Sequence, residues 1–130
     1  YMTDQEQLDE FTKGYEAIAA VTGAEASKVI RVPGGNLNEN TARLLSTLAT
    51  FEIGWNIDTR DWEKPGVQAI VNNIMQVQPG YIVLMHDGGG DRSQTVEALR
   101  QALPLLKEQG YQFVTMDELL SRCGVVEPLS

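Results

Sequence analysis

The sequence predicts an α/β fold of parallel βα repeats, and two patterns carry the prediction. Short apolar or β-branched runs begin near residues 28, 52, 81 and 111, and segments with helical spacing of apolar residues separate them. The run 81–85 is almost continuously apolar, as in a strand that is covered on both faces. Alternation at this spacing is typical of βαβ units, which join parallel strands by right-handed crossovers.

Each element follows from a local signal. The first helix is expected to begin at the capping box Thr3-Asp4-Gln5-Glu6 and to end at Gly23. Between them, residues recur at helical spacing: Leu8, Phe11, Tyr15, Ile18 and Thr22. Strands are expected at residues 28–32, 51–57, 81–85 and 111–116. A second helix is expected at residues 38–49, and a third runs from Pro65, in its first turn, to residue 77. A long fourth helix is expected from a cap at Ser93 to residue 109, with a kink at Pro104. A short final helix is expected after a cap at Asp117.

The composition is that of one globular domain, expected over residues 1–124, with a tail at 125–130. The 130 residues carry 18 acidic and 10 basic side chains, a net charge of −8, without the cation cluster that nucleic acid or anionic lipid would need. No apolar run approaches the ~18 residues of a membrane span. Cys123 cannot form an internal disulfide, and a single histidine cannot build a zinc site of two or three imidazoles.

Polar side chains gather where three of the four expected strands end. Function in parallel α/β proteins concentrates at this edge of the sheet, so we expect the three clusters to lie within reach of one pocket. The segments at these strand ends are Ile30-Arg31-Val32-Pro33-Gly34-Gly35, Trp55-Asn56-Ile57-Asp58-Thr59-Arg60-Asp61-Trp62 and Leu84-Met85-His86-Asp87-Gly88.

These residue types suit proton transfer next to a sugar. Imidazole is the side chain that titrates near neutral pH, so His86 is the natural proton donor or acceptor, and a buried aspartate beside it would hold its tautomer. Arg31 could orient a second carboxylate. Gly34 and Gly35 let backbone N–H groups approach a ligand closely, as an oxyanion hole requires. Trp62 offers a flat face on which a sugar ring can stack.

Each of these residues also has a structural interpretation. A lone histidine at a strand end is more often structural than catalytic, Asp61-Trp62 suits a capping turn followed by a core aromatic, and Arg31 suits a solvated charge. Gly88-Gly89-Gly90 before Ser93 indicates either a flexible turn or an anion-binding helix start, but lacks the Gly-Lys-Ser/Thr ending of a phosphate loop. Three polar clusters at three successive strand ends favour a functional site.

Three motifs resemble those of a known enzyme family. Arg31-x-Pro33-x-Gly35, Asp58-x-x-Asp61-Trp62 and Leu84-x-His86-Asp87 are similar to the third, fourth and fifth motifs of the polysaccharide deacetylases, the NodB-homology enzymes of carbohydrate esterase family 4. The motifs stand in the family's order with helices between them, and the segment 110–119 follows. The resemblance covers essentially the whole chain.

The resemblance implies the C-terminal part of a distorted (β/α) barrel around a divalent metal, usually zinc. It implies a hydrolase that removes N- or O-acetyl groups from a polysaccharide, with N-acetylglucosamine units of peptidoglycan or chitin as the first expectation and xylan as another. By position, His86 resembles the general acid, and Asp61 resembles the carboxylate that tunes it, with Asp58 as a second choice. Arg31 resembles the arginine that pairs with the catalytic base.

The same resemblance assigns substrate contacts. Pro33, Gly34, Trp62 and Leu84 resemble residues that line the substrate groove and acetyl pocket, with the Gly34 N–H at the oxyanion position. The family often has an aromatic residue after the proline of the third motif. Here Gly34 takes that place, so one wall of a subsite is expected to be open.

Two family motifs are absent from this sequence. The Asp-Asp pair that supplies the base and a metal ligand has no counterpart, and neither does the His-x-x-x-His pair. Both normally precede the helix with which the chain opens, so we expect a piece of a longer deacetylase that binds no metal and is inactive by itself. We expect it to pair with its missing N-terminal fragment or with another copy. The resemblance implies a secreted or cell-envelope protein, although the acidic N-terminus holds no signal peptide.

Two other functions stay open. The first is a carbohydrate-binding or regulatory module on the same fold, without catalysis. The second is a phosphate or nucleotide binder that uses the glycine-rich loop 88–93 at a helix start.

Overall fold

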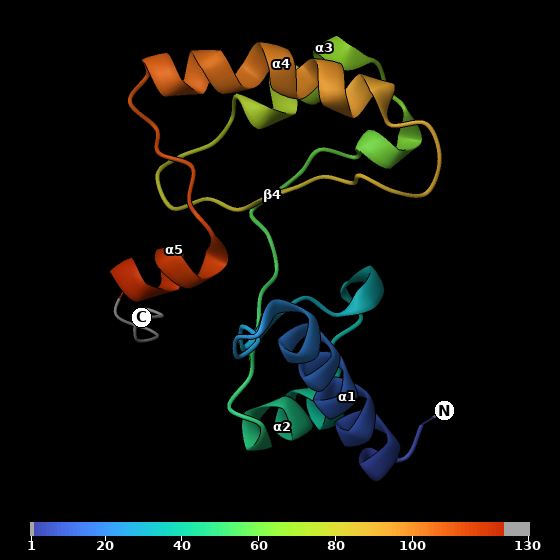
Figure 1. The fold of residues 1–130 in the computed structure, drawn as a ribbon. Coiled ribbons are helices and arrows are strands. Elements are labelled where there is room, and N and C mark those ends of the chain that lie inside the picture. The colour runs from blue at the N-terminus through green and yellow to red at the C-terminus, as the bar shows by residue number, and fades with distance from the viewer. Residues whose placement is uncertain (1, 124–130) are drawn as a thin grey trace. The chain divides into compact units, whose positions relative to one another are not determined.

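The computed structural model describes residues 2–123, which form two compact units (Figure 1). The first unit contains residues 2–54 and 116–123, and the second is Trp55–Thr115. One domain over residues 1–124 stays a prediction, and the predicted tail 125–130 lies outside the described residues. Within residues 2–123, no helix has the length and apolar character needed to cross a membrane.

The first unit combines helices with a pair of parallel strands. Helix α1 is Asp4–Thr22, α2 is Glu39–Thr47 and α5 is Met116–Arg122, and a 3₁₀ helix covers Pro33–Gly35. Strands β1 (Val29–Ile30) and β2 (Phe51–Glu52) run parallel, with Val29 opposite Phe51. The buried apolar residues of this unit are Ala26, Val32, Leu44 and Leu45.

The predicted ends of α1 are confirmed. The Glu6 N–H donates to the Thr3 hydroxyl at 3.3 Å, and the Thr3 N–H donates to the Glu6 carboxylate at 2.7 Å, which completes the capping box. Gly23 follows the helix in the left-handed conformation, at φ 69°. The start of α1 is tied to α2, because Asn40 and Arg43 both donate to the Asp4 carboxylate at 2.7 Å.

The second unit repeats the parallel pairing. Strands β3 (Ile57–Asp58) and β4 (Val83–Leu84) run parallel, with Ile57 opposite Val83. Helix α3 is Val67–Ile74, α4 is Ser93–Glu108, and a 3₁₀ helix covers Asp61–Glu63. This unit carries the fourth and fifth motifs, and the first unit carries the third.

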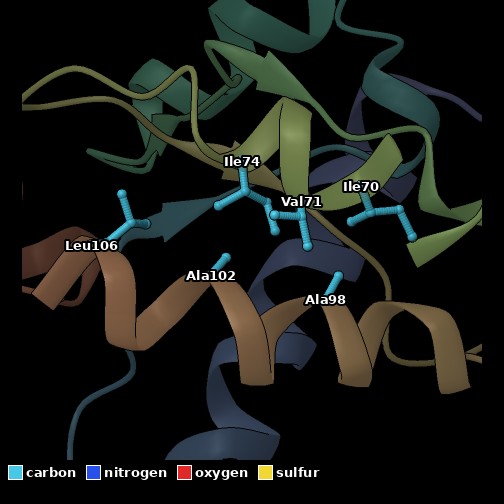
Figure 2. Packing of buried hydrophobic residues seen from close by; sticks show 6 residues of the cluster. All are labelled: Ile70, Val71, Ile74, Ala98, Ala102 and Leu106. Carbon is cyan, nitrogen blue, oxygen red and sulfur yellow. The ribbon is translucent and has the colours of Figure 1, made fainter. Parts of the chain in front are cut away.

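The core of the second unit lies between α3 and α4, whose apolar faces meet (Figure 2). Ala98 and Ala102 on α4 are fully buried, and small side chains there let the two helices approach closely. Leu106 completes the same face of α4, at i, i+4 and i+8 spacing. The facing residues of α3 are Ile70, Val71 and Ile74.

The parallel α/β character is confirmed, but the strands differ from the prediction. The single strand expected over 51–57 is wrong, because β2 pairs with β1 and β3 pairs with β4 in two separate sheets. Gly54 and Asn56 lie between them. The Asn56 side-chain oxygen accepts the Ile82 N–H at 2.8 Å, where a continuous strand would offer a backbone carbonyl.

The strand expected over 111–116 is also wrong. The Tyr111 N–H donates back to the Leu106 carbonyl at 3.1 Å, and the Tyr111 hydroxyl donates to the Val77 carbonyl at 3.0 Å. No strand is formed over residues 111–115, and α5 already begins at Met116. Alternating apolar residues give a strand only where a neighbouring strand supplies pairing groups.

Three predicted helix starts shift by one or two residues. Helix α3 begins at Val67 because Gly66, at φ 103°, is not helical, so Pro65 precedes the helix. Ser93 is the first residue of α4 rather than its cap, and its N–H donates to the Asp91 carboxylate at 2.9 Å. Asp117 lies inside α5. Helix α4 continues through Pro104 to Glu108.

Candidate functional site

Asp61 is the centre of a buried polar cluster in the second unit. It opens the 3₁₀ helix that follows β3, and only 1% of its surface is exposed. One carboxylate oxygen, Oδ1, lies 2.7 Å from the Nδ1 atom of His86. The other, Oδ2, accepts the His86 main-chain N–H at 2.8 Å and the Thr95 hydroxyl at 2.8 Å. Three elements therefore meet at one carboxylate: the end of β3, the end of β4 and the first turn of α4.

The surroundings of Asp61 keep it charged. Burial by itself raises the pKa of its carboxyl group. The hydrogen bonds from the His86 main chain, the His86 ring and the Thr95 hydroxyl lower it by more, so the pKa of Asp61 lies below its ordinary value of 3.8. Asp61 is therefore an ionised carboxylate at neutral pH, and it can only accept hydrogen bonds.

This charge fixes the role of each nitrogen of the His86 ring. Because Asp61 can only accept, Nδ1 must carry the hydrogen of their 2.7 Å contact. Nε2 has no hydrogen-bond partner within residues 2–123, and 38% of the His86 side chain is exposed. Nε2 is therefore the ring atom that can exchange a proton with a bound molecule. The expected contact between His86 and a carboxylate is confirmed, and the partner is Asp61.

Asp58, the second choice for that carboxylate, lies elsewhere. Its Oδ1 atom accepts the Arg60 N–H at 2.9 Å, in the turn that leads from β3 to Asp61. Arg60 then forms an ion pair with Glu63 and lies over the ring of Trp62, 5.7 Å from its centre. Trp62 is half exposed, so part of its surface is open to solvent.

A cavity of about 350 Å³ lies beside His86. Met85, Val96 and Leu99 form the apolar part of its lining. The remaining lining residues are Asp87, Arg92 and Thr95.

The glycine-rich loop is closed by its own side chains. The Arg92 guanidinium donates to the carbonyls of Gly88 at 2.8 Å and Gly89 at 3.3 Å. The Asp91 carboxylate accepts the first N–H of α4. A negative charge already occupies the helix start, which disfavours the phosphate-binding function that the glycines left open.

Leu84 is in β4, and its carbonyl accepts the hydroxyl of the fully buried Thr59 at 2.8 Å. This hydrogen bond holds β4, the strand that precedes His86, against Thr59 at the end of β3. The place of Leu84 in the acetyl pocket stays a prediction.

The residues of the third motif belong to the first unit. Arg31 is exposed, and its guanidinium donates to the Gly54 carbonyl at 3.2 Å. Pro33 opens the 3₁₀ helix, and Gly34 adopts φ 68°, where a Cβ atom would stand 3.0 Å from the Asn36 side chain. The conformation and the close approach of Asn36 favour glycine at this position. The convergence of Arg31, Pro33 and Gly34 with His86 stays a prediction, because these residues and His86 belong to different units.

The donor set in residues 2–123 does not fit a transition metal. No three side chains of His, Cys, Asp or Glu come together in this part of the chain. The only imidazole already gives Nδ1 to Asp61, and a zinc site needs three or four ligands in tetrahedral array.

Thr95 was not predicted as part of the site. Its position on α4 held a usable signal, since it precedes Ala98 and Ala102 by three and seven residues and so shares their buried face. A hydroxyl on a core-facing position needs a hydrogen-bond partner. The sequence does not say which partner.

Comparisons with known proteins agree with the motifs. No family model matches the chain. Over 95 residues the chain is 48% identical to a peptidoglycan-N-acetylglucosamine deacetylase from Bacillus cereus. The aligned region covers 71% of this chain and 45% of the relative. The chain spans about half the length of the curated relatives it matches.

Solved structures give the same result. The carbohydrate esterase family 4 domain of a multidomain xylanase, from the hindgut metagenome of Trinervitermes trinervoides, matches with a TM-score of 0.84 at 32% identity, over 98% of this chain and 60% of that one. A pseudoenzyme of the same family from Bacillus anthracis matches with a TM-score of 0.78 at 31% identity, over 92% of this chain and 41% of that one.

The parallel α/β units and the buried aspartate–histidine pair thus occur in a chain similar to deacetylases in both sequence and structure. The chain belongs to carbohydrate esterase family 4, the NodB-type polysaccharide deacetylases.

Proposed function

We propose that this chain carries the proton-donating part of a polysaccharide deacetylase active site, on the C-terminal part of a distorted (β/α) barrel. The observation that carries the proposal is the buried Asp61 carboxylate bound to Nδ1 of a half-exposed His86. The substrate class is a polysaccharide with N-acetylglucosamine units, as in peptidoglycan or chitin. The names of the similar deacetylases support this class, and a secreted or cell-envelope location follows from it.

The proposed proton donor is protonated His86. Hydrolysis adds the oxygen of water to the acetyl carbonyl carbon while the base takes one proton of that water. The carbon–nitrogen bond then breaks to give a free sugar amine and acetic acid, which loses its proton to solvent and becomes acetate. As the bond breaks, Nε2–H gives its proton to the departing nitrogen. The Asp61 carboxylate accepts the Nδ1–H of the ring before and after the transfer, so Nδ1 keeps its hydrogen throughout. In an O-acetyl ester the same proton would go to the departing oxygen.

The other motif residues take the roles that their family positions imply. Arg31 would pair with the carboxylate that acts as base, and the Gly34 N–H would donate to the oxyanion. Pro33, Trp62 and Leu84 would line the groove and the acetyl pocket. The half-exposed side chain of Trp62 suits contact with a sugar ring.

We propose that the base and the metal ligands lie outside residues 2–123. The family resemblance implies a divalent metal, zinc most often, and the described donor set does not fit one. The chain alone would then be inactive, and activity would need the residues that carry the first two family motifs.

The test is acetate release from N-acetylglucosamine oligomers and from peptidoglycan. We expect no release by the chain alone and zinc-dependent release by a longer form that includes residues encoded before Tyr1. In that form, His86→Gln should lower kcat by about 10²–10⁴-fold, the usual contribution of a general acid. Gln68→Ala, on the exposed side of α3, is the control and should leave kcat unchanged. Full activity of His86→Gln would overturn the proposal.

A second candidate is a carbohydrate-binding module without catalysis. The similarity to a family pseudoenzyme favours it. Calorimetric binding of chitooligosaccharides, with no acetate release from any longer form, would support this candidate over the first.

A further inference from the structure

We infer that Thr95 is a positioning residue for His86 and that it acts through Asp61. The inference rests on the proposed function for its catalytic meaning, since it concerns the orientation of the proposed general acid. Its structural content is independent, because it concerns which nitrogen of the His86 ring carries the hydrogen.

Thr95 completes the set of donors around one carboxylate oxygen. The Oδ2 atom of Asp61 receives the Thr95 hydroxyl from α4 and the His86 N–H from the end of β4, both at 2.8 Å. Because two donors bind Oδ2, the other oxygen, Oδ1, faces Nδ1 of the ring. The carboxylate torsion of aspartate is broad by itself, so two fixed donors on one oxygen decide which way the group faces.

Without the hydroxyl, Oδ2 would keep a single donor on this buried side chain. The carboxylate could then rotate, and its contact with Nδ1 would weaken. A neutral imidazole whose Nδ1 contact is weakened can place its hydrogen on Nε2 instead. That tautomer cannot bind Asp61 through Nδ1–H, and the ring loses its fixed orientation.

The hydroxyl is itself held by the core of the unit. Thr95 is 4% exposed and lies on the face of α4 that continues into Ala98 and Ala102. The Gly66 N–H donates to the Gln94 side chain at 2.9 Å, which ties the residue before Thr95 to the start of α3. A β-branched side chain on a packed helix has few rotamers, so helix packing sets the hydroxyl position.

The chain offers a sharp test because it has a single histidine. Long-range ¹H–¹⁵N spectra of the neutral imidazole therefore show one pair of ring nitrogens, and their shifts report the tautomer. In the wild-type chain we expect Nδ1 to be the protonated atom. In Thr95→Val, which keeps the shape and removes the hydroxyl, the two ring ¹⁵N shifts should move toward each other as the tautomers mix. Thr95→Ser should restore the wild-type shifts.

Thr59→Val is the matched control. Thr59 is fully buried and its hydroxyl also makes a 2.8 Å hydrogen bond, but to the Leu84 carbonyl rather than to Asp61. This variant should lose stability without moving the ring shifts. Unchanged shifts in Thr95→Val, or an equal movement in Thr59→Val, would overturn the inference. If Thr95→Val fails to fold, the ring shifts of Thr95→Ser, which keeps the hydroxyl, are compared with those of Thr95→Ala, which lacks it.

Measurements of activity distinguish a failure of this inference from a failure of the proposed function. In an active longer form, Thr95→Val should lower kcat by up to about 100-fold through misplacement of the acid, with KM nearly unchanged. If the ring shifts move but no form deacetylates, the proposed function fails and the positioning role stands. If wild type is active and kcat and the ring shifts are both unaffected, the positioning role fails.

Discussion

Asp61 is a buried carboxyl group whose charge makes the stability of the fold depend on pH. Because its pKa in the folded chain lies below 3.8, folding favours the charged form. The stabilisation is fully present above the unfolded-state pKa and is lost as pH falls through the folded-state pKa. Asp61→Asn removes that charge from a buried site with three donors, so we expect it to cost about 1–3 kcal/mol at neutral pH and less in acid.

Urea unfolding of the full chain at neutral pH and near pH 3 measures this difference. Asp87→Asn is a suitable control, since Asp87 is the exposed neighbour of His86. It should stay within about 0.5 kcal/mol of wild type in unfolding free energy at both pH values. An Asp61→Asn deficit of the same size at both pH values would contradict the assignment.

The residues of the site were predictable to different degrees. His86 and Asp61 lie at the ends of two strands that pair directly, so their contact follows from parallel topology. Thr95 lies thirty-four residues beyond Asp61 and meets it only because α4 packs back on α3. A helix-phase argument places its hydroxyl in the core, but only the packed structure identifies its acceptor.

At the scale of elements, the closeness of α3 and α4 depends on two alanines. Ala98 and Ala102 are fully buried against Ile70, Val71 and Ile74 (Figure 2). Ala102→Leu adds volume that this interface has no room for, so we expect a loss of about 1–3 kcal/mol in unfolding free energy. Ala20→Leu, at an exposed position of α1, makes the same chemical change and should stay within about 0.5 kcal/mol. Equal unfolding midpoints for wild type and Ala102→Leu in urea would contradict this packing.

The helices were predicted better than the strands for a physical reason. A helix satisfies its backbone within one segment, and the box at Thr3 and the stop at Gly23 are local signals. A strand needs a partner, and the sequence around residues 51–57 does not say that its two ends pair with different strands. The segment 111–115 has strand-like alternation, yet its Tyr111 bonds to Leu106 and Val77 instead.

For the whole molecule, the open surfaces predict association. Each sheet in residues 2–123 has two strands and therefore two outer edges without a strand neighbour in that sheet. Helix α4 also presents a shallow apolar groove of about 380 Å³, lined by Val96, Leu99, Arg100, Leu103 and Pro104. Unpaired strand edges and exposed apolar surface are features that proteins usually cover. We therefore expect the chain to pair, with residues that precede it in a longer protein or with another copy of itself.

The net charge decides how pairing between copies should respond to salt. Two chains that each carry −8 repel each other, and about 0.15 M salt shortens the range of that repulsion to about 8 Å. Self-association through apolar surface should therefore strengthen as salt is added, whereas pairing through opposite charges would weaken. Light scattering at micromolar concentration, in low and in moderate salt, measures the mass of the particle. A stable monomer at both salt concentrations, with no other peptide in its mass spectrum, would show that these edges and this groove need no cover, and the expectation of pairing would have to be given up.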